Sequence, residues 1–384
     1  MKRLPSEVYV LGVISLFTDI ASEMVYPILP LFLTTVLGAT TTTVGLVEGV
    51  AEATASLFKV VGGRVSDRIA ARKPVILLGY GLPTLLRPIL ALATAPWQVL
   101  TYRFLDRVGK GLRTAPRDAV IAEVSSNENY GRNYGFHRAM DTIGASIGPF
   151  LAFLLLPLVG FRGVFWLSAI PGVLAALVIV FFLREKRGIP KPLPPLRLSA
   201  FSPQYRWFLL VSGLFTLGLS SNAFLILRLK SLGFSDAQST LVYTVYNLLY
   251  ALLSYPLGSL GDRIGVHRLV TLGFAAYAGV YLGFGLSTAP WQGVALFLLY
   301  ALYSAAFEGG SRAYLAKVIP ATEKASAIGL YTTLVGVLLL PSSLLFGFLW
   351  QRFSPSVAFF SGAAFAAAAL VLFLFQPRPQ PSSA

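Results

Sequence analysis

The sequence predicts an all-α membrane protein with twelve transmembrane helices, and two observations carry that prediction. The chain has 384 residues, of which 55% are hydrophobic and only 12% are charged, and its mean hydropathy is +0.71. The apolar residues come in blocks of about twenty, the length of helix that crosses about 30 Å of hydrocarbon. Lipid offers no hydrogen-bond partner to backbone amides, so these blocks are expected to be helices. A β-barrel is not expected, because the sequence lacks strands of about ten residues that alternate between apolar and polar side chains.

The expected spans are the apolar blocks that lie between short polar connections. Their approximate bounds are 8–37, 43–61, 74–94, 97–123, 133–157, 162–183, 206–229, 238–257, 268–287, 291–317, 326–350 and 354–375. The basic start of the chain, Lys2-Arg3 followed by apolar residues, is interpreted as the beginning of the first span. A signal peptide is disfavoured because Asp19 and Glu23 interrupt the apolar stretch and no small-residue cleavage site follows.

The placement of the basic residues explains the net charge of +15. Lys and Arg gather in alternate connections, for example 64–73 and 184–206, whereas the turns at 94–97 and 288–291 hold none. The positive-inside rule therefore predicts a multi-pass protein of the cell inner (plasma) membrane with both termini in the cytoplasm. This pattern makes the lipid bilayer, and not a nucleic acid, the expected partner of the positive charge.

The residue inventory argues against enzyme chemistry. The chain has no cysteine and only two histidines, His137 and His267, which is a poor supply of nucleophiles, bases and metal ligands. The segment 109–111, Gly-Lys-Gly, lacks the preceding glycine spacing of a nucleotide-binding loop and lies inside an expected span. We therefore predict no enzymatic activity, no cofactor and no metal.

The chain also contains an internal repeat. Thr-Ala-Pro-Trp-Gln at 94–98 recurs at 288–292, an offset of 194, and Gly-x-x-x-Asp-Arg at 63–68 recurs at 258–263, an offset of 195. Two motifs repeated at one spacing indicate two homologous halves in parallel orientation. We expect an N-terminal six-helix bundle, a basic and proline-rich cytoplasmic linker and a C-terminal six-helix bundle, at 1–183, 184–205 and 206–384.

These motifs resemble those of the major facilitator superfamily. Residues 63–73, Gly-Arg-Val-Ser-Asp-Arg-Ile-Ala-Ala-Arg-Lys, are similar to its G-x-x-x-D-R-x-G-R-K signature, with Ala70 replacing a glycine. Residues 103–109, Arg-Phe-Leu-Asp-Arg-Val-Gly, resemble its R-x-x-Q-G-x-G signature, with Asp106 at the glutamine position. Gly-Ala-Ser-Ile-Gly-Pro at 144–149 looks like the glycine–proline signature of its antiporters. The resemblance implies two bundles around a central cavity and transport by alternating access.

The fourth expected span carries an unusual charged face. Its charged residues recur at steps of three and four, which places them on one side of a helix: Arg103, Asp106, Arg107, Lys110, Arg113 and Arg117. At 1.5 Å per residue this face runs through the middle of the bilayer. A charge there costs about 2.5–3.5 kcal/mol even on the lenient insertion scale, so the face is expected to meet water or charged partners.

Carboxylates on the first two spans supply those partners. A buried carboxylate can take up a proton when a neighbouring arginine moves away, which is the minimum requirement for proton coupling. The expected coupling residues are Asp19, Glu23, Glu48, Glu52 and Asp106, with Arg103 as the mobile counter-charge. The alternative is a permanently paired ion network that only keeps the fourth span in the bundle.

Two further sets of candidates follow from charge and position. The cations of the fourth span and two polar residues of the seventh are expected to bind an anionic substrate: Arg107, Lys110, Arg113, Asn222 and Arg228. The repeated loops and the inner ends of spans 4 and 10 are expected to gate the cavity: Gly63, Asp67, Arg68, Arg72, Arg117, Gly258, Asp262, Arg263, Glu308 and Arg312. The first glycine of the loop motif is expected to permit close helix packing.

The sequence thus predicts proton-coupled secondary transport of a small organic solute, anionic or amphipathic, with efflux as the expected direction and a monomer as the expected state. Aromatic residues are expected to cover its apolar part: Tyr26, Phe215, Phe224, Tyr300 and Tyr303. Two other functions stay open. One is exchange or uptake of an anionic metabolite without proton coupling; the other is lipid scrambling, which a hydrophilic groove open to lipid would favour over a closed cavity.

Overall fold

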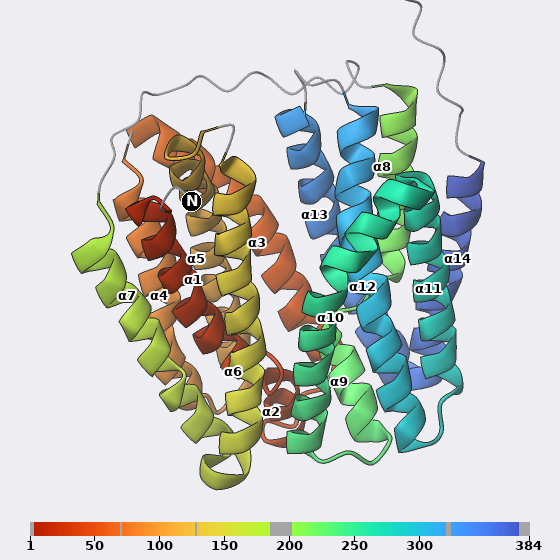
Figure 1. The fold of residues 1–384 in the computed structure, drawn as a ribbon. Helices are drawn as coiled ribbons and strands as arrows, with labels where there is room; N and C mark the ends of the chain where they lie inside the picture. The colour runs from red at the N-terminus through yellow and green to blue at the C-terminus, as the bar shows by residue number, and fades with distance from the viewer. Residues whose placement is uncertain (1–3, 70, 127–128, 185–201, 320–323, 376–384) are drawn as a thin grey trace, which may run out of the picture.

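The computed structural model describes residues 4–69, 71–126, 129–184, 202–319 and 324–375, and the elements formed by these residues are all helices (Figure 1). In chain order they are α1 (Ser6–Val25), α2 (Leu29–Thr35), α3 (Thr41–Ile69), α4 (Lys73–Ala91), α5 (Pro96–Glu123), α6 (Tyr130–Leu167), α7 (Ala169–Phe182), α8 (Pro203–Gly218), α9 (Asn222–Ser231), α10 (Asp236–Ile264), α11 (Val266–Leu286), α12 (Pro290–Val318), α13 (Lys324–Arg352) and α14 (Pro355–Leu374).

The helices form two bundles that stand side by side, α1–α7 and α8–α14 (Figure 1). We call the face at which α1 begins and α14 ends the terminal side, and the other face the opposite side. The terminal side is at the top of Figure 1. The expected linker lies outside the described residues except at its edges, so the division at 184–205 stays a prediction.

Breaks in the helices occur where the chain bends or turns. α1 and α2 are separated around Pro27, and α8 and α9 are separated at 219–221, so corresponding spans of the two bundles are both broken. Gly160 has φ +66°, a left-handed conformation that glycine adopts without steric cost. This residue ends the long part of α6 and reverses the chain toward α7, between the fifth and sixth expected spans.

Eight segments of the described residues are long and apolar enough to cross a membrane. Three of the longer helices, α3, α5 and α10, are not among them because charged residues, or many tyrosine and polar residues, lower their hydropathy. The stretch Tyr130–Phe182 counts as one segment of 53 residues although it turns at Gly160. The prediction of an all-helical protein is confirmed for the described residues, whereas the count of twelve spans stays a prediction.

The two bundles pack closely along α3 and α13 toward the opposite side. The Thr41 hydroxyl donates a hydrogen bond to the carbonyl oxygen of Gly347 at 3.0 Å. A Cβ atom added at Gly49 would lie 2.9 Å from the Cα of Leu340, and one added at Gly45 would collide with the backbone of α13. These contacts occupy the part of α3 farthest from the terminal side, so the bundles are closed together there.

A second seam between the bundles runs along α6 and α10. The side-chain amide of Asn247 donates to the carbonyl oxygen of Ala145 at 3.0 Å, and Arg138 donates to the hydroxyl of Tyr250 at 3.5 Å. The short helices α2 and α9 also meet on the opposite side (Figure 1). The interior between the bundles is therefore flanked by one packed helix pair on each side.

The C-terminal bundle is held together largely by aromatic rings. Phe215 makes edge-on contacts with Phe274 and Tyr277 at centroid distances of 4.8 and 5.0 Å, and Tyr277 stacks on Tyr281 at 4.0 Å. Such offset and edge-on pairs add stability beyond simple area burial. This bundle is accordingly rich in rings where the N-terminal bundle is rich in charge.

The α3–α13 contact predicts that Gly45→Ala destabilises the fold by about 1–3 kcal/mol, because the new methyl group meets immobile backbone. The matched control is Gly279→Ala on α11, where a Cβ atom would meet nothing within 4 Å and alanine is the better helix former. Thermal unfolding of the two purified variants should show a loss for Gly45→Ala only. An equal midpoint for both would show that this glycine is not needed for close packing.

Candidate substrate and coupling site

A cavity of about 750 Å³ lies between the bundles and is lined by residues of α1, α3, α5, α6, α10 and α12. Its lining includes carboxylates, Asp19, Asp118 and Asp141, and a larger set of cations, Lys59, Lys110, Arg113, Arg117, Arg138 and Arg312. Sites for small molecules commonly have about 300–1,000 Å³. This cavity is thus large enough for a small organic solute and carries an excess of positive charge.

A smaller cavity of about 30 Å³ continues from the large one into the N-terminal bundle. Asp19, Lys110 and Arg113 line both cavities, and Glu23 and Asp106 line the small one. Its volume suits one or two water molecules at most. The two cavities together form a polar path from the large chamber to the buried charges of α5.

Glycine contacts orient the charged face of α5. A Cβ atom at Gly109 would lie 2.7 Å from the carbonyl oxygen of Gly79 on α4, so these helices touch at their backbones. This contact turns Arg103, Asp106 and Arg107 inward, where they are buried. The inner part of the face expected from the spacing therefore lies in the interior of the protein, whereas Lys110 and Arg117 line the large cavity.

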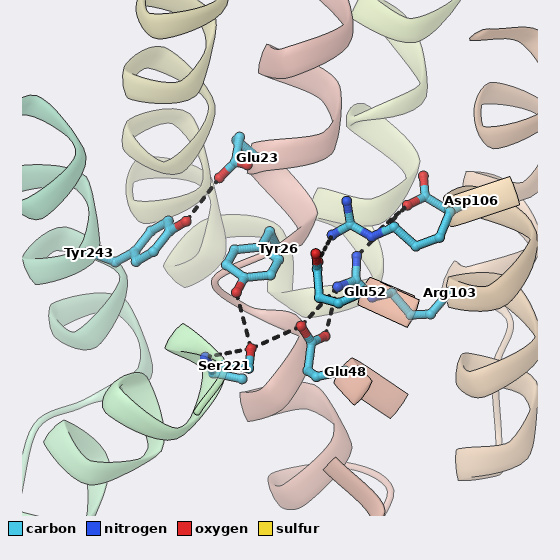
Figure 2. Close-up of polar contacts among 10 residues, drawn as sticks. Glu23, Tyr26, Glu48, Glu52, Arg103, Asp106, Ser221 and Tyr243 are labelled. Carbon is cyan, nitrogen blue, oxygen red and sulfur yellow. Dashed lines mark hydrogen bonds and ion pairs between the residues drawn. The ribbon is translucent and has the colours of Figure 1, made fainter. Parts of the chain in front are cut away.

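The deepest part of the site is a buried ion pair (Figure 2). The Arg103 guanidinium donates to both carboxylate oxygens of Glu48 at 2.8 and 3.0 Å, and both side chains are almost fully buried. Asp106 lies 3.8 Å from Arg103 and 3.8 Å from Arg107, and Arg107 lies 3.6 Å from Glu52. The structure brings together the acids of α3 and the charges of α5 in one network.

Hydroxyl groups connect this network to the C-terminal bundle (Figure 2). Ser221, at the break between α8 and α9, donates to Glu48 at 3.1 Å and lies 3.2 Å from the hydroxyl of Tyr26, at the break between α1 and α2. Tyr243 of α10 donates to Glu23 at 3.2 Å. Carboxylates of the N-terminal bundle thus accept hydrogen bonds from neutral groups of the other bundle.

The motif at 144–149 positions the acids of α1. A Cβ atom at Gly144 would lie 2.9 Å from the Cβ of Asp19, and one at Gly148 would lie 2.8 Å from the Cβ of Glu23. The two glycines let α6 approach α1 closely at both carboxylates. Among the described residues Asp19 makes no ion pair, although Lys110 and Arg113 line the same cavity walls.

The motif residues expected to gate the cavity lie at the terminal side. Arg72 links Asp67 at 2.6 Å with Glu123, at the end of α5, at 3.0 Å. Arg68 and Arg263 are exposed. Asp67 thus pairs within its own loop region and not with an arginine of the α5 face.

Two details of the gating hypothesis need correction. The tightest helix contact is made by Gly62, whose added Cβ would collide with the backbone of Leu112, whereas one at Gly63 would make a close but looser contact with the side chain of Ala115 at 3.3 Å. Gly258, the counterpart of Gly63, has open space around it. The motif position alone did not reveal which of two adjacent glycines faces α5.

The structure also gives the surroundings of two other gating candidates. Arg117 donates to its neighbour Asp118 at 2.9 and 3.0 Å, and Arg312 lines the large cavity. The side chains of Asp262 and Glu308 lie outside the described part of the structure.

The candidates of the C-terminal bundle separate into different environments. Arg228 donates to the carbonyl oxygens of Ser287 and Phe284 at 2.7 and 3.2 Å, so it caps the end of α11 away from the cavities. Asn222 lines a further cavity of about 310 Å³ together with aromatic residues that include Tyr300 and Tyr303. Arg228 is accordingly left out of the proposed binding set.

Two of the aromatic residues expected at the solute are fully buried in the hydrophobic core. They are Phe215 and Phe224, at 1% and 0% exposure, so they pack and do not line a cavity.

Several polar residues of the site were not among the candidates chosen from the sequence. The sequence did not indicate a role for Ser221 or Tyr243, because a lone hydroxyl side chain is common in an apolar span. Asp141 accepts a hydrogen bond from Ser15 and lies 3.7 Å from His137. Arg87 of α4 is 1% exposed, and its position inside an apolar span between two prolines was a signal that could have been used.

The fold and the site together define a class, a helical membrane protein whose two bundles enclose a charged cavity. The family model described as Major Facilitator Superfamily matches residues 11–229 and 207–384. The chain belongs to the Major Facilitator Superfamily. This confirms the resemblance seen in the sequence motifs.

Known proteins that this chain resembles agree with that assignment. An uncharacterized MFS-type transporter of Methanocaldococcus jannaschii is 34% identical over 384 residues, covering 97% of this chain and 96% of the relative. The multidrug resistance protein MdtH of Photorhabdus laumondii is 30% identical over 164 residues, 43% of this chain and 40% of MdtH. The solved nucleoside transporter NupG matches with a TM-score of 0.79 and 15% identity over 97% of this chain and 99% of that one, which shows the fold.

The buried ion pair predicts that Glu48→Gln destabilises the protein by about 3 kcal/mol or more, because the Arg103 guanidinium loses its charged partner in a buried site. Glu123→Gln is the control, since Glu123 pairs with Arg72 at the surface and such pairs contribute about 1 kcal/mol or less. Chemical or thermal unfolding in detergent compares the two. A small loss for Glu48→Gln would mean that the pair is solvated.

Proposed function

We propose that this chain is a proton-coupled secondary transporter that moves a small organic solute, anionic or amphipathic, by alternating access, with efflux as its direction. The observation that carries the proposal is the position of Asp19. Its carboxylate lines the large cavity and the small one, and makes no ion pair among the described residues. An acid that is reachable from the cavity and adjoins a buried charge network has what proton uptake and release require.

The orientation in the membrane is part of the proposal. The basic residues of the loop after α3 and those at the start of α11, such as Arg72 and Arg268, lie on the terminal side. The positive-inside rule supports a cytoplasmic location for this side and for both termini in the inner membrane. With that orientation, the bundles are packed together outside and the large cavity lies toward the cytoplasm.

Alternating access would require the contacts on the opposite side to separate. The bonds that must break are those from Ser221 to Glu48 and from Tyr243 to Glu23, together with the α3–α13 contact. The proposed solute site is the large cavity, with Lys110 and Arg113 facing the anionic group and Asp19 beside them. Binding of solute and binding of a proton would then influence each other through the same three side chains.

Whether solute binding makes Asp19 release a proton or take one up depends on which group of the solute faces Asp19. A cationic or hydrogen-bonding group of an amphipathic solute would displace the proton and give exchange, which suits efflux. The glycine–proline motif and the partial similarity to MdtH support this direction. An anion held by Lys110 and Arg113 would instead favour a protonated Asp19.

The cation excess therefore favours a second candidate function, transport of an organic anion by uptake or exchange. In that mechanism Lys110 and Arg113 hold the substrate, and no proton gradient is required. Lipid scrambling has less support, because the packed pairs α3–α13 and α6–α10 flank the cavity on both sides.

Asp19→Asn is expected to abolish solute-driven proton movement while leaving solute–solute exchange intact, because asparagine keeps the shape but cannot release a proton. The assay uses proteoliposomes with an internal pH-sensitive dye and a panel of organic anions and amphipathic dyes. Asp236→Asn is the control, since Asp236 pairs with Lys230 outside the cavities at 2.6 Å. Unchanged proton movement in Asp19→Asn contradicts the coupling role, and flux that needs only a counter-anion supports the exchanger.

Lys110→Gln is expected to weaken binding of anionic members of the same panel about tenfold and to leave neutral members unchanged, because it removes one charged hydrogen-bond donor from the cavity. Arg263→Gln, an exposed change on the terminal side, is the control. Quenching of tryptophan fluorescence in the purified protein reports affinity. Equal losses for anionic and neutral solutes would remove the case for a site that recognises charge.

A further inference from the structure

The cavity of about 310 Å³ in the C-terminal bundle differs in chemistry from the charged site. Its walls come from α9, α10, α12 and α13 and from the break between α8 and α9. They carry uncharged hydroxyl and amide groups, among them those of Ser220, Asn222, Tyr246, Tyr300, Tyr303 and Ser304. We call this cavity the tyrosine pocket. Its volume is at the lower end of the range for small-molecule sites, which suits one ring system of a solute.

The aromatic rings of the tyrosine pocket hold one another in place. Tyr246 stacks on Tyr300 at a centroid distance of 5.6 Å, and Tyr300 packs against Tyr303 at 5.2 Å. Tyr303 in turn stacks at 5.6 Å on Phe307, which also lines the pocket. A wall that is fixed before a ligand arrives loses little conformational freedom on binding. Because aromatic pairs gain from offset and edge-on contacts, this wall favours a flat ring over a flexible alkyl chain.

Polar groups of the pocket can recognise a substituent on such a ring. The side chain of Asn222 is half-buried, lines the pocket and makes no hydrogen bond with any described residue. Its amide offers two N–H donors and one acceptor oxygen. A hydroxyl group on the ring would provide a partner for this amide, whereas a plain hydrocarbon would leave it without one.

The tyrosine pocket adjoins the large cavity at Arg312, which lines both. The two cavities also meet along α10, where Tyr246 lines the pocket and the next residue, Asn247, lines the large cavity. Among the described residues of the pocket wall, Arg312 carries the charge and none is acidic. A ring in the pocket therefore has an arginine beside it on the side of the large cavity, and this arginine attracts an acidic group and repels a basic one.

We propose that the tyrosine pocket holds an uncharged aromatic ring of the transported solute, and that this solute is an aromatic organic acid whose acidic group lies at Arg312 in the large cavity. This substrate class rests on the anion-binding part of the proposed function and narrows it. An aromatic acid has partners in both cavities. An amphipathic cation meets an arginine beside the pocket and no carboxylate among the described residues of its wall.

The test compares acids that differ only in the ring. The full chain in lipid nanodiscs is titrated with hydrocinnamate, its para-hydroxylated analogue phloretate and its saturated analogue cyclohexanepropanoate, and calorimetry gives each affinity. Hydrocinnamate is expected to bind about fivefold more tightly than the saturated acid because of ring contacts, and phloretate about fivefold more tightly again because of one hydrogen bond. A site that is only hydrophobic would instead prefer the saturated ring, which is the more apolar one.

Variants of α13 locate the ring. Val335→Trp places a bulky side chain in the pocket and is expected to remove the preference for aromatic acids. Val337→Trp is the matched control, because Val337 lies on the same helix, is 41% exposed and is not part of the pocket wall. This control is expected to keep the preference. If the preference also survives in Val335→Trp, the ring binds elsewhere and the assignment of the pocket is wrong.

Two further variants test the polar contacts. Asn222→Leu is expected to remove only the gain from the ring hydroxyl, so that phloretate and hydrocinnamate bind equally. Arg312→Gln is expected to weaken hydrocinnamate about tenfold and to leave the neutral ligand para-propylphenol unchanged. Equal losses for the acid and the phenol would contradict the placement of the acidic group at Arg312.

Octanoate separates failure of this inference from failure of the proposed function. Octanoate binding that depends on Lys110, without any preference for aromatic acids, would overturn the tyrosine pocket as a ring site and leave the proposed function standing. Absence of Lys110-dependent binding for octanoate and for all three ring acids would instead overturn the anion-binding proposal itself.

Discussion

The structure depends on one constraint, that charges placed at the depth of the lipid tails must find partners inside the protein. A lone charge at the centre of a bilayer costs several kcal/mol, and breaking a buried pair leaves the survivor with the full desolvation cost. The pair between Arg103 and Glu48 meets this constraint for α5 and α3. Because these charges cannot face lipid, α5 has only one possible rotation about its axis, and that rotation supplies the wall of the cavity.

Close approach of the helices makes the pairing possible. In lipid, apolar side chains gain little by leaving their surroundings, so helices associate through backbone contact at small residues. Gly79 and Gly109 bring α4 against α5, and Gly144 and Gly148 bring α6 against the two acids of α1. The glycines and the charges are thus parts of one arrangement, since a methyl group at any of these positions would push apart two helices that carry or contact the charged residues.

Sequence spacing predicted the parts of this arrangement that lie within a single helix. The three- and four-residue steps along α5 placed its charges on one face. Contacts between different helices could not be predicted from sequence spacing in the same way. Arg228 looked like a binding residue because it is charged, yet it caps α11, and Ser221 was passed over although it contacts Glu48. Which helices meet, and at which residue, depends on packing that no one-dimensional pattern encodes.

The distribution of strong and weak interactions favours movement between the bundles. The ion pairs among the described residues each lie within one bundle, as in Arg103 with Glu48. In the polar bonds that cross between the bundles, at least one partner is a neutral group, for example the hydroxyl of Ser221 or of Tyr243. A hydrogen bond of this kind contributes about 0.5–3 kcal/mol and can exchange with water, whereas separating a buried ion pair cannot be offset so easily. This distribution supports the proposed alternating access, in which the bundles would rock apart as rigid bodies while each retains its internal charge network.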